Sequence, residues 1–132
     1  MASIFTRIIQ GEIPCYKVAE DAQFIAFLDV NPVERGHVLV VPKQEIDYIF
    51  DLPEDLYLSL HAFARRVAIA LRKAVPCVRI ATAVIGLEVP HTHIHLIPLP
   101  EGKTFINFSA KRHVPSREEM QQIADDVAAA FV

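Results

Sequence analysis

Residues 37–41, with the sequence His-Val-Leu-Val-Val, form an almost wholly apolar run that strongly constrains the fold of this chain. Such a run is typical of a strand that is covered on both faces, so we expect it to be central in a sheet. Two flanking runs around the polar turn at residues 20–23 predict a hairpin. The segments with strand character are residues 16–19, 24–28, 37–41, 78–85 and 91–98.

Three other segments carry apolar residues at helical spacing. The first spans residues 4–9 and ends at Gly11. The second starts at Asp-Leu-Pro-Glu of residues 51–54, where a capping residue and an acid have the spacing of a helix start, and it ends before Pro76. Ser116 caps the third, which continues to the end of the chain.

The 132 residues include 52% hydrophobic and 22% charged side chains, which is enough apolar material for one folded core. We therefore expect a single domain over residues 1–132. Strands and helices are grouped and do not strictly alternate, which predicts an α+β fold. The expected architecture is a mainly antiparallel five-stranded sheet with a long helix, a short N-terminal helix and a C-terminal helix.

Charge and termini limit the partners that this chain can bind. The net charge of −3 argues against a broad basic face, so we expect no duplex nucleic acid as a partner, whereas a small anionic ligand remains compatible. No apolar run approaches the roughly 18–20 residues that span a bilayer, and the first residues lack a signal sequence. We expect a cytoplasmic protein without membrane contact. Cys15 and Cys77 are far apart in sequence, and we expect both to be reduced thiols.

Residues 91–97, His-Thr-His-Ile-His-Leu-Ile, place three of the six histidines at alternate positions. Side chains alternate between the faces of a strand, so His91, His93 and His95 are expected to project together. Three interpretations are open. The row could be structural, although Ile or Val would fill such a face more stably. It could bind a metal, or it could be a reaction centre in which one imidazole attacks a phosphorus or carbonyl atom.

At this row the sequence resembles the histidine triad (HIT) superfamily of nucleotidyl hydrolases and transferases. The resemblance extends to residues 4–14, which look like the opening helix of that family. It also includes Phe-Leu-Asp-Val-Asn-Pro of residues 27–32, similar to its nucleoside-binding strand, and Gly-His-Val-Leu-Val-Val-Pro-Lys of residues 36–43. These segments occur in the family's order over roughly the first hundred residues.

The resemblance implies that His93 attacks the α-phosphorus of a nucleotide and forms a nucleotidyl-histidine, while His91 and His95 hold the oxygens and assist the leaving group. Neither a metal nor another cofactor is expected. The carboxylate of Asp29 would accept hydrogen bonds from the ribose, with a turn-capping role as the alternative. The base pocket implied by the resemblance is formed by Phe5, Ile8, Phe27, Leu28 and Val30, for each of which plain core packing is the alternative.

Several positions depart from the family pattern. Ser3 and Thr6 stand where zinc-binding relatives have a Cys-x-x-Cys, and Glu45 replaces a histidine that those relatives use as a further ligand. We therefore expect no structural zinc, which metal analysis can check. Leu87 stands where relatives have Gln, and no Asn lies between Val78 and His91, where relatives have one on the strand before the triad. These changes remove polar phosphate contacts, so weak activity or an unusual substrate is consistent with the sequence.

Two function classes remain open. The first is an enzyme acting on a nucleoside phosphoramidate or dinucleotide, and the second is a nucleotide-binding or interaction protein with little turnover. Glu88 would repel a phosphate if it pointed into the site, or select a substrate with a cationic group. The family pairs through its long helix, and Leu58 and Ile69 give this helix a second apolar face. We therefore expect a homodimer.

Overall fold

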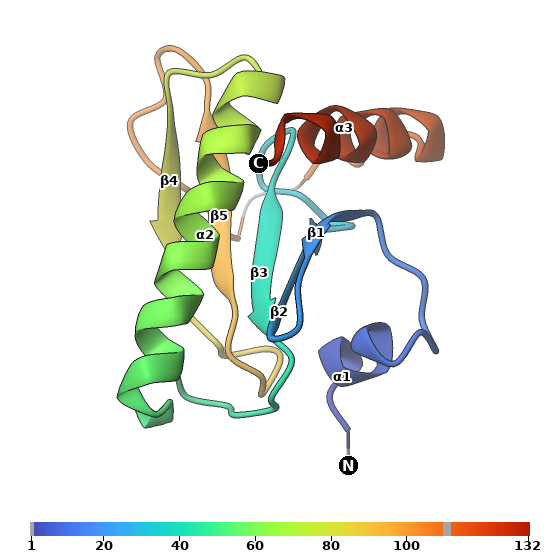
Figure 1. Ribbon diagram of the computed structural model, residues 1–132. Helices are drawn as coiled ribbons and strands as arrows, with labels where there is room; N and C mark the ends of the chain where they lie inside the picture. The colour runs from blue at the N-terminus through green and yellow to red at the C-terminus, as the bar shows by residue number, and fades with distance from the viewer. Residues whose placement is uncertain (1, 110–111) are drawn as a thin grey trace.

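The computed structural model describes residues 2–109 and 112–132 (Figure 1). Within these residues, five strands form one sheet in the order β1-β2-β3-β5-β4, with every neighbouring pair antiparallel. This confirms the predicted α+β fold and the central position of the apolar strand. The strands are β1 (Lys17–Glu20), β2 (Phe24–Leu28), β3 (Val38–Pro42), β4 (Arg79–Ala83) and β5 (Ile94–Leu99).

Two helices cover one face of the sheet. Helix α2 (Glu54–Ala74) contacts β3, β4 and β5, and helix α3 (Arg117–Ala130) packs on α2 and β1 (Figure 1). Ser116 caps α3 as predicted, because its Oγ accepts the N–H of Glu119 at 3.1 Å. None of the helices in the described residues is both long and apolar enough to cross a bilayer.

The short helix α1 (Ile4–Ile9) packs against the opposite face of the sheet. Alternation along the strands separates the two faces. On β2, Ala26 belongs to the core under α2 and α3, whereas Phe27 belongs to a smaller cluster under α1. The same alternation brings Asp29, His37 and His95 to the α1 side, and this side carries the candidate site.

Gly36 directs the chain into β3. Its φ of 86° lies in the left-handed region that favours glycine, and a Cβ at this position would lie 3.0 Å from a methyl of Val75. The following residue, His37, is fully enclosed and donates its backbone N–H to the carbonyl of Glu34 at 3.1 Å. The tight turn therefore fixes His37 at the entrance to the central strand.

Two predicted strands are shorter in the structure. The strand expected over residues 91–98 begins at Ile94, because the backbone N–H of Thr92 bonds to the carbonyl of Ile46 at 2.8 Å, outside the sheet ladder. The strand expected over residues 78–85 covers Arg79–Ala83. The histidines therefore do not share one regular strand.

The predicted cap of the long helix is also wrong. Asp51 ends a 3₁₀ helix, η1 (Ile49–Asp51), and α2 begins three residues later with Pro53 at its N-cap and no side-chain capping bond. The carbonyl of Pro53 accepts the backbone N–H of Tyr57 at 2.9 Å, so the helical bonding pattern begins at Pro53 without a side-chain cap. The end of α2 before Pro76 is as predicted.

Candidate active site

A cavity of about 430 Å³ opens on the α1 side of the sheet. His93 and His95 line it, whereas His91 does not. All the side chains that the resemblance assigns to nucleotide binding also line this cavity, and they are Phe5, Ile8, Phe27, Leu28, Asp29, Val30 and Glu88. One end of the cavity is therefore mainly apolar, and the histidines form part of its polar wall.

The tautomer of His93 follows from its backbone contact. The Nδ1 of His93 lies 2.7 Å from the carbonyl oxygen of His91, and a carbonyl can only accept a hydrogen bond, so Nδ1 carries the proton. In the neutral ring, the Nε2 of His93 then has a free lone pair. The ring packs edge-on against Phe5, with centroids 5.0 Å apart, which limits its rotation. His93 is thus oriented as a nucleophile or base.

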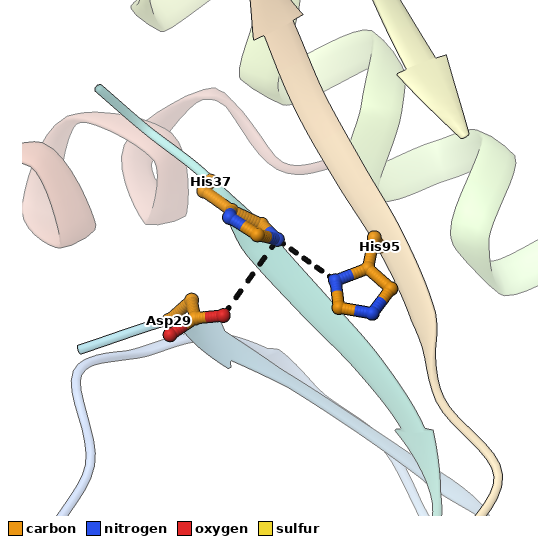
Figure 2. Close-up of side chains that lie close together, drawn as sticks. All are labelled: Asp29, His37 and His95. Atoms are coloured by element: carbon orange, nitrogen blue, oxygen red, sulfur yellow. Dashed lines mark hydrogen bonds and ion pairs between the residues drawn. The ribbon is translucent and has the colours of Figure 1, made fainter. Parts of the chain in front are cut away.

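A second chain of contacts sets the tautomer of His95 (Figure 2). The backbone N–H of Val33 donates to Nδ1 of His37 at 3.0 Å, so the proton of the neutral His37 ring is on Nε2. That Nε2 lies 2.9 Å from Nδ1 of His95 and donates to it. His95 must then carry its own proton on Nε2. His95 can therefore donate a hydrogen bond, whereas His93 presents a lone pair.

Burial keeps the rings of His37 and His95 neutral. It lowers the pKa of His37 to about 3, helped by the neighbouring charge of His95 and Arg112. It lowers the pKa of His95 to about 4, with contributions from His93 and Arg112. Hydrogen-bond directions derived for neutral rings therefore hold at neutral pH.

Asp29 lies directly beyond β2, opposite the entrance to β3. Its Oδ1 accepts the backbone N–H of Asn31 at 2.8 Å, and its Oδ2 is 3.7 Å from Nε2 of His37 (Figure 2). Burial raises the pKa of the Asp29 carboxyl, and the bond from Asn31 opposes this rise. The side chain thus combines the predicted turn contact with a position on the cavity wall.

Asp29, His37 and His95 also meet the distance requirement for a metal site, because each offers a ligand atom within 4.8 Å of the others. A neutral histidine that binds a metal through Nε2 must carry its proton on Nδ1. Nδ1 of His37 instead accepts the N–H of Val33, which leaves the proton on Nε2. These residues therefore fit a hydrogen-bond chain better than a metal site.

His91 occupies a different place from the one that the row of histidines predicts. It is fully buried, and both ring nitrogens have partners: Nε2 lies 2.8 Å from the carbonyl of Pro42, and Nδ1 lies 2.7 Å from Oγ of Ser3. The carbonyl requires the proton on Nε2, so Ser3 donates to Nδ1. The ring of His91 therefore anchors the loop that precedes β5. The backbone carbonyl of His91 orients the ring of His93.

The positions that depart from the zinc-binding pattern meet around His91. The carboxylate of Glu45 accepts the backbone N–H of Ser3 at 2.8 Å and the hydroxyl of Thr6 at 2.5 Å. Oγ1 of Thr6 also lies 3.4 Å from Nδ1 of His91. Hydroxyls are poorer zinc ligands than thiolates, so the residues of this cluster fit a hydrogen-bond network better than a zinc site. It ties α1 to the loop that carries His91.

Three site residues were missed from the sequence. His37 was placed in a strand but not in the site, although a histidine at the start of an apolar strand is an unusual residue there. Phe108 packs edge-on against His95, with centroids 5.1 Å apart, and Arg112 lines the cavity. Phe108 and Arg112 themselves lie outside the helices and strands, and nothing in their spacing indicates the site.

His93, His95 and Asp29 line one cavity on a sheet that is antiparallel throughout and is covered by helices, an α+β arrangement. A model of the HIT domain matches residues 10–102. The chain is 30% identical over 129 residues to an adenosine 5′-monophosphoramidase of Schizosaccharomyces pombe, and the match covers 97% of each chain. The chain therefore belongs to the HIT-domain family.

Solved structures agree with this assignment. A Hit-like protein involved in cell-cycle regulation from Bartonella henselae superposes with a TM-score of 0.85 at 29% identity, covering 98% of this chain and 96% of that one. A zinc-bound histidine triad family protein from Mycobacterium smegmatis gives a TM-score of 0.84 at 28% identity, covering 98% and 93%. The family thus accounts for the sheet, the helices and the histidine motif.

Proposed function

We propose that this protein is a nucleotidyl hydrolase or transferase acting on the α-phosphate of a purine nucleotide conjugate, of the phosphoramidate or dinucleotide type, through a covalent nucleotidyl-histidine. The observation that carries the proposal is the pair of tautomers at the cavity wall. His93 presents an unprotonated Nε2, and His95, with its ring centroid 4.9 Å away, presents an N–H. Nucleophilic attack with charge stabilisation needs this combination.

The apolar end of the cavity suits a nucleobase. Phe5 and Phe27 pack edge-on there, with ring centroids 5.7 Å apart, and Ile8 and Val30 extend the wall. Asp29 lines the same cavity, with its Oδ2 3.7 Å from Nε2 of His37, and its carboxylate can accept hydrogen bonds from ribose hydroxyls. A nucleoside bound in this way would place its 5′-phosphate toward His93.

In the first step, Nε2 of His93 attacks the α-phosphorus. The bond from phosphorus to the leaving nitrogen or oxygen breaks with its electron pair, and the leaving atom takes a proton from water. The N–H of His95 donates to a phosphate oxygen as charge develops. His95 does so as a hydrogen-bond donor, because its neighbour His37 holds it in this tautomer.

In the second step, water or another acceptor attacks phosphorus from the opposite side. The bond from phosphorus to His93 breaks, its electron pair returns to Nε2, and the attacking water loses a proton to solvent. The carbonyl of His91 holds the ring of His93 in one orientation through both steps. His91 is in this proposal a positioning residue.

The second candidate is a nucleotide-binding protein with little turnover, favoured by the exposed apolar Leu87 at the cavity, where relatives carry a polar residue. AMP titration by calorimetry, combined with an assay of amine release from adenosine 5′-phosphoramidate, separates the two. An enzyme binds AMP and releases amine over many cycles. Binding with less than one released amine per protein would favour the second candidate.

We also propose a homodimer formed through α2 and the edge strand β4. Leu58 and Ile69 on α2 are 59% and 43% exposed, and a groove of about 420 Å³ between α2 and the sheet is lined by Ala64, Ala68 and other residues. A symmetric contact would cover these side chains. Replacing Leu58 and Ile69 with Glu should give folded monomers in sedimentation experiments.

The matched control places the same two charges on exposed positions of α3, as Ala128→Glu with Ala129→Glu. This control should sediment as the wild-type protein does. A dimeric Leu58→Glu, Ile69→Glu variant would place the interface elsewhere.

A further inference from the structure

Arg112 lies at the cavity wall between the last strand and α3. It is half-buried, and two backbone carbonyls hold its guanidinium group: one terminal nitrogen donates to Asn31, and the other donates to Phe108 at 2.7 Å. The guanidinium therefore has a defined position next to the loop that follows Asp29.

These two bonds leave most of the guanidinium group available to a ligand. A guanidinium has five N–H donors in a planar fork, and such forks match phosphate oxygens in pairs. Arg112 lines the same cavity as His93 and His95. Its positive charge also acts on the site, because it helps to lower the pKa of His95 and opposes the rise that burial causes in the pKa of Asp29.

The charged residues of the cavity wall show why the position of Arg112 matters for binding a phosphate. Among the described residues that line the cavity, Arg112 is the one lysine or arginine, and Asp29 and Glu88 are the acids. A phosphate entering beside these carboxylates would be repelled by them, since like charges at close range in a partly buried site repel each other. One fixed cation on the wall can offset that repulsion.

Leu87 and Val89 flank Glu88 on the cavity wall, and their apolar side chains offer no hydrogen-bond donor to a phosphate. We propose that Arg112 binds the phosphate group of the nucleotide and so takes over a contact that the motif segment of this chain does not provide. This inference rests on the proposed nucleotide function. It assigns a specificity role for phosphate to a residue outside the histidine motif.

The competing explanation is that Arg112 only fastens two loops together. Both explanations predict weaker binding when Arg112 is replaced, so the test compares two ligands that differ in the phosphate alone. We would measure the Kd of AMP and of adenosine for the wild-type protein and for Arg112→Gln, Arg112→Lys and Arg117→Gln. Arg117 is exposed at the start of α3 and does not line the cavity, so Arg117→Gln removes the same charge outside the cavity wall.

Arg112→Gln should weaken AMP binding by about 10- to 100-fold, as expected for loss of a charged hydrogen bond, and change the Kd of adenosine by less than about twofold. Arg112→Lys should recover most of the AMP affinity, because it keeps the charge. Arg117→Gln should bind both ligands as the wild-type protein does. The loss for Arg112→Gln should shrink in high salt.

An equal weakening of AMP and adenosine in Arg112→Gln would overturn the inference and assign Arg112 to loop packing. Unchanged AMP binding would overturn it as well. In either case, tight binding of AMP by the wild-type protein would leave the proposed function standing. A wild-type protein that binds neither ligand would overturn both the proposed function and the inference that rests on it.

Discussion

Nε2 of His37 lies 2.9 Å from Nδ1 of His95, and this contact determines which nitrogen of His95 carries the proton toward the cavity. The direction of the bond is set further back, by the backbone N–H of Val33. A residue outside the histidine motif thus controls the hydrogen-bonding character of a residue within it.

His37→Asn and His37→Gln test this control. The amide of Gln can reach the position of Nε2 and donate to His95, whereas the shorter Asn cannot. His37→Asn should lower kcat by about 10- to 100-fold, the range found when partners of metal-bound histidines are removed, and His37→Gln should retain more activity. AMP affinity should change little in either variant. Equal kcat values for the two variants would argue against control of the tautomer by His37.

The buried histidines also predict how stability depends on pH. The pKa values of His37 (about 3) and His95 (about 4) lie below the ordinary 6.5, so the unfolded chain takes up these protons at higher pH than the folded chain does. The free energy of unfolding should therefore fall as pH falls from 7 to 5. The limiting slope is about 1.4 kcal/mol per pH unit for each histidine.

Urea unfolding at several pH values between 7 and 5 measures this slope. His37→Asn should show a shallower dependence, because one of the linked protons is removed. The control, His113→Asn, changes an exposed histidine that does not line the cavity and should keep the wild-type slope. Identical slopes in all three proteins would show that His37 is not neutral and buried in solution.

Glu88 is exposed and lines the cavity wall, and its charge acts on the site, because it contributes to the raised pKa of the Asp29 carboxyl. Two unit charges about 5 Å apart repel by roughly 3 kcal/mol at an effective dielectric near 20, but exposure to solvent reduces this effect. Glu88→Ser should therefore strengthen AMP binding by about 3- to 10-fold at low salt.

Calorimetric titration with AMP at low and high salt checks this expectation. Glu101→Ser removes an exposed acid away from the cavity and should leave the Kd unchanged. Unchanged or weaker AMP binding by Glu88→Ser would indicate instead that the Glu88 carboxylate lies outside the phosphate pocket or selects a substrate with a cationic group.

The sequence predicted the parts of the fold that depend on local patterns. The apolar run of β3, the helical spacing of α2 and the cap at Ser116 each depend on neighbouring residues, and the structure has all three. The apolar pocket residues could also be predicted, because the resemblance to the family extends through residues 4–14 and 27–32. All of them line the cavity.

The positions that depend on long-range contacts could not be predicted. His91 leaves the row because Ser3 and Pro42, both distant in sequence, bind its ring nitrogens. His37 reaches His95 because β3 pairs with β5, and Arg112 reaches the cavity through an irregular segment. Alternation assigns a side chain to a face of a strand, but the partner on that face is set by the tertiary fold.

The turnover of His93→Ala tests the central claim most directly. Steady-state release of amine from adenosine 5′-phosphoramidate would be measured for this variant, with His113→Ala as the exposed control and the Kd of AMP as a check on folding. Loss of a covalent nucleophile should lower kcat by several orders of magnitude while the Kd of AMP stays close to the wild-type value. A His93→Ala variant that retains turnover within about threefold of the wild-type protein would contradict the account.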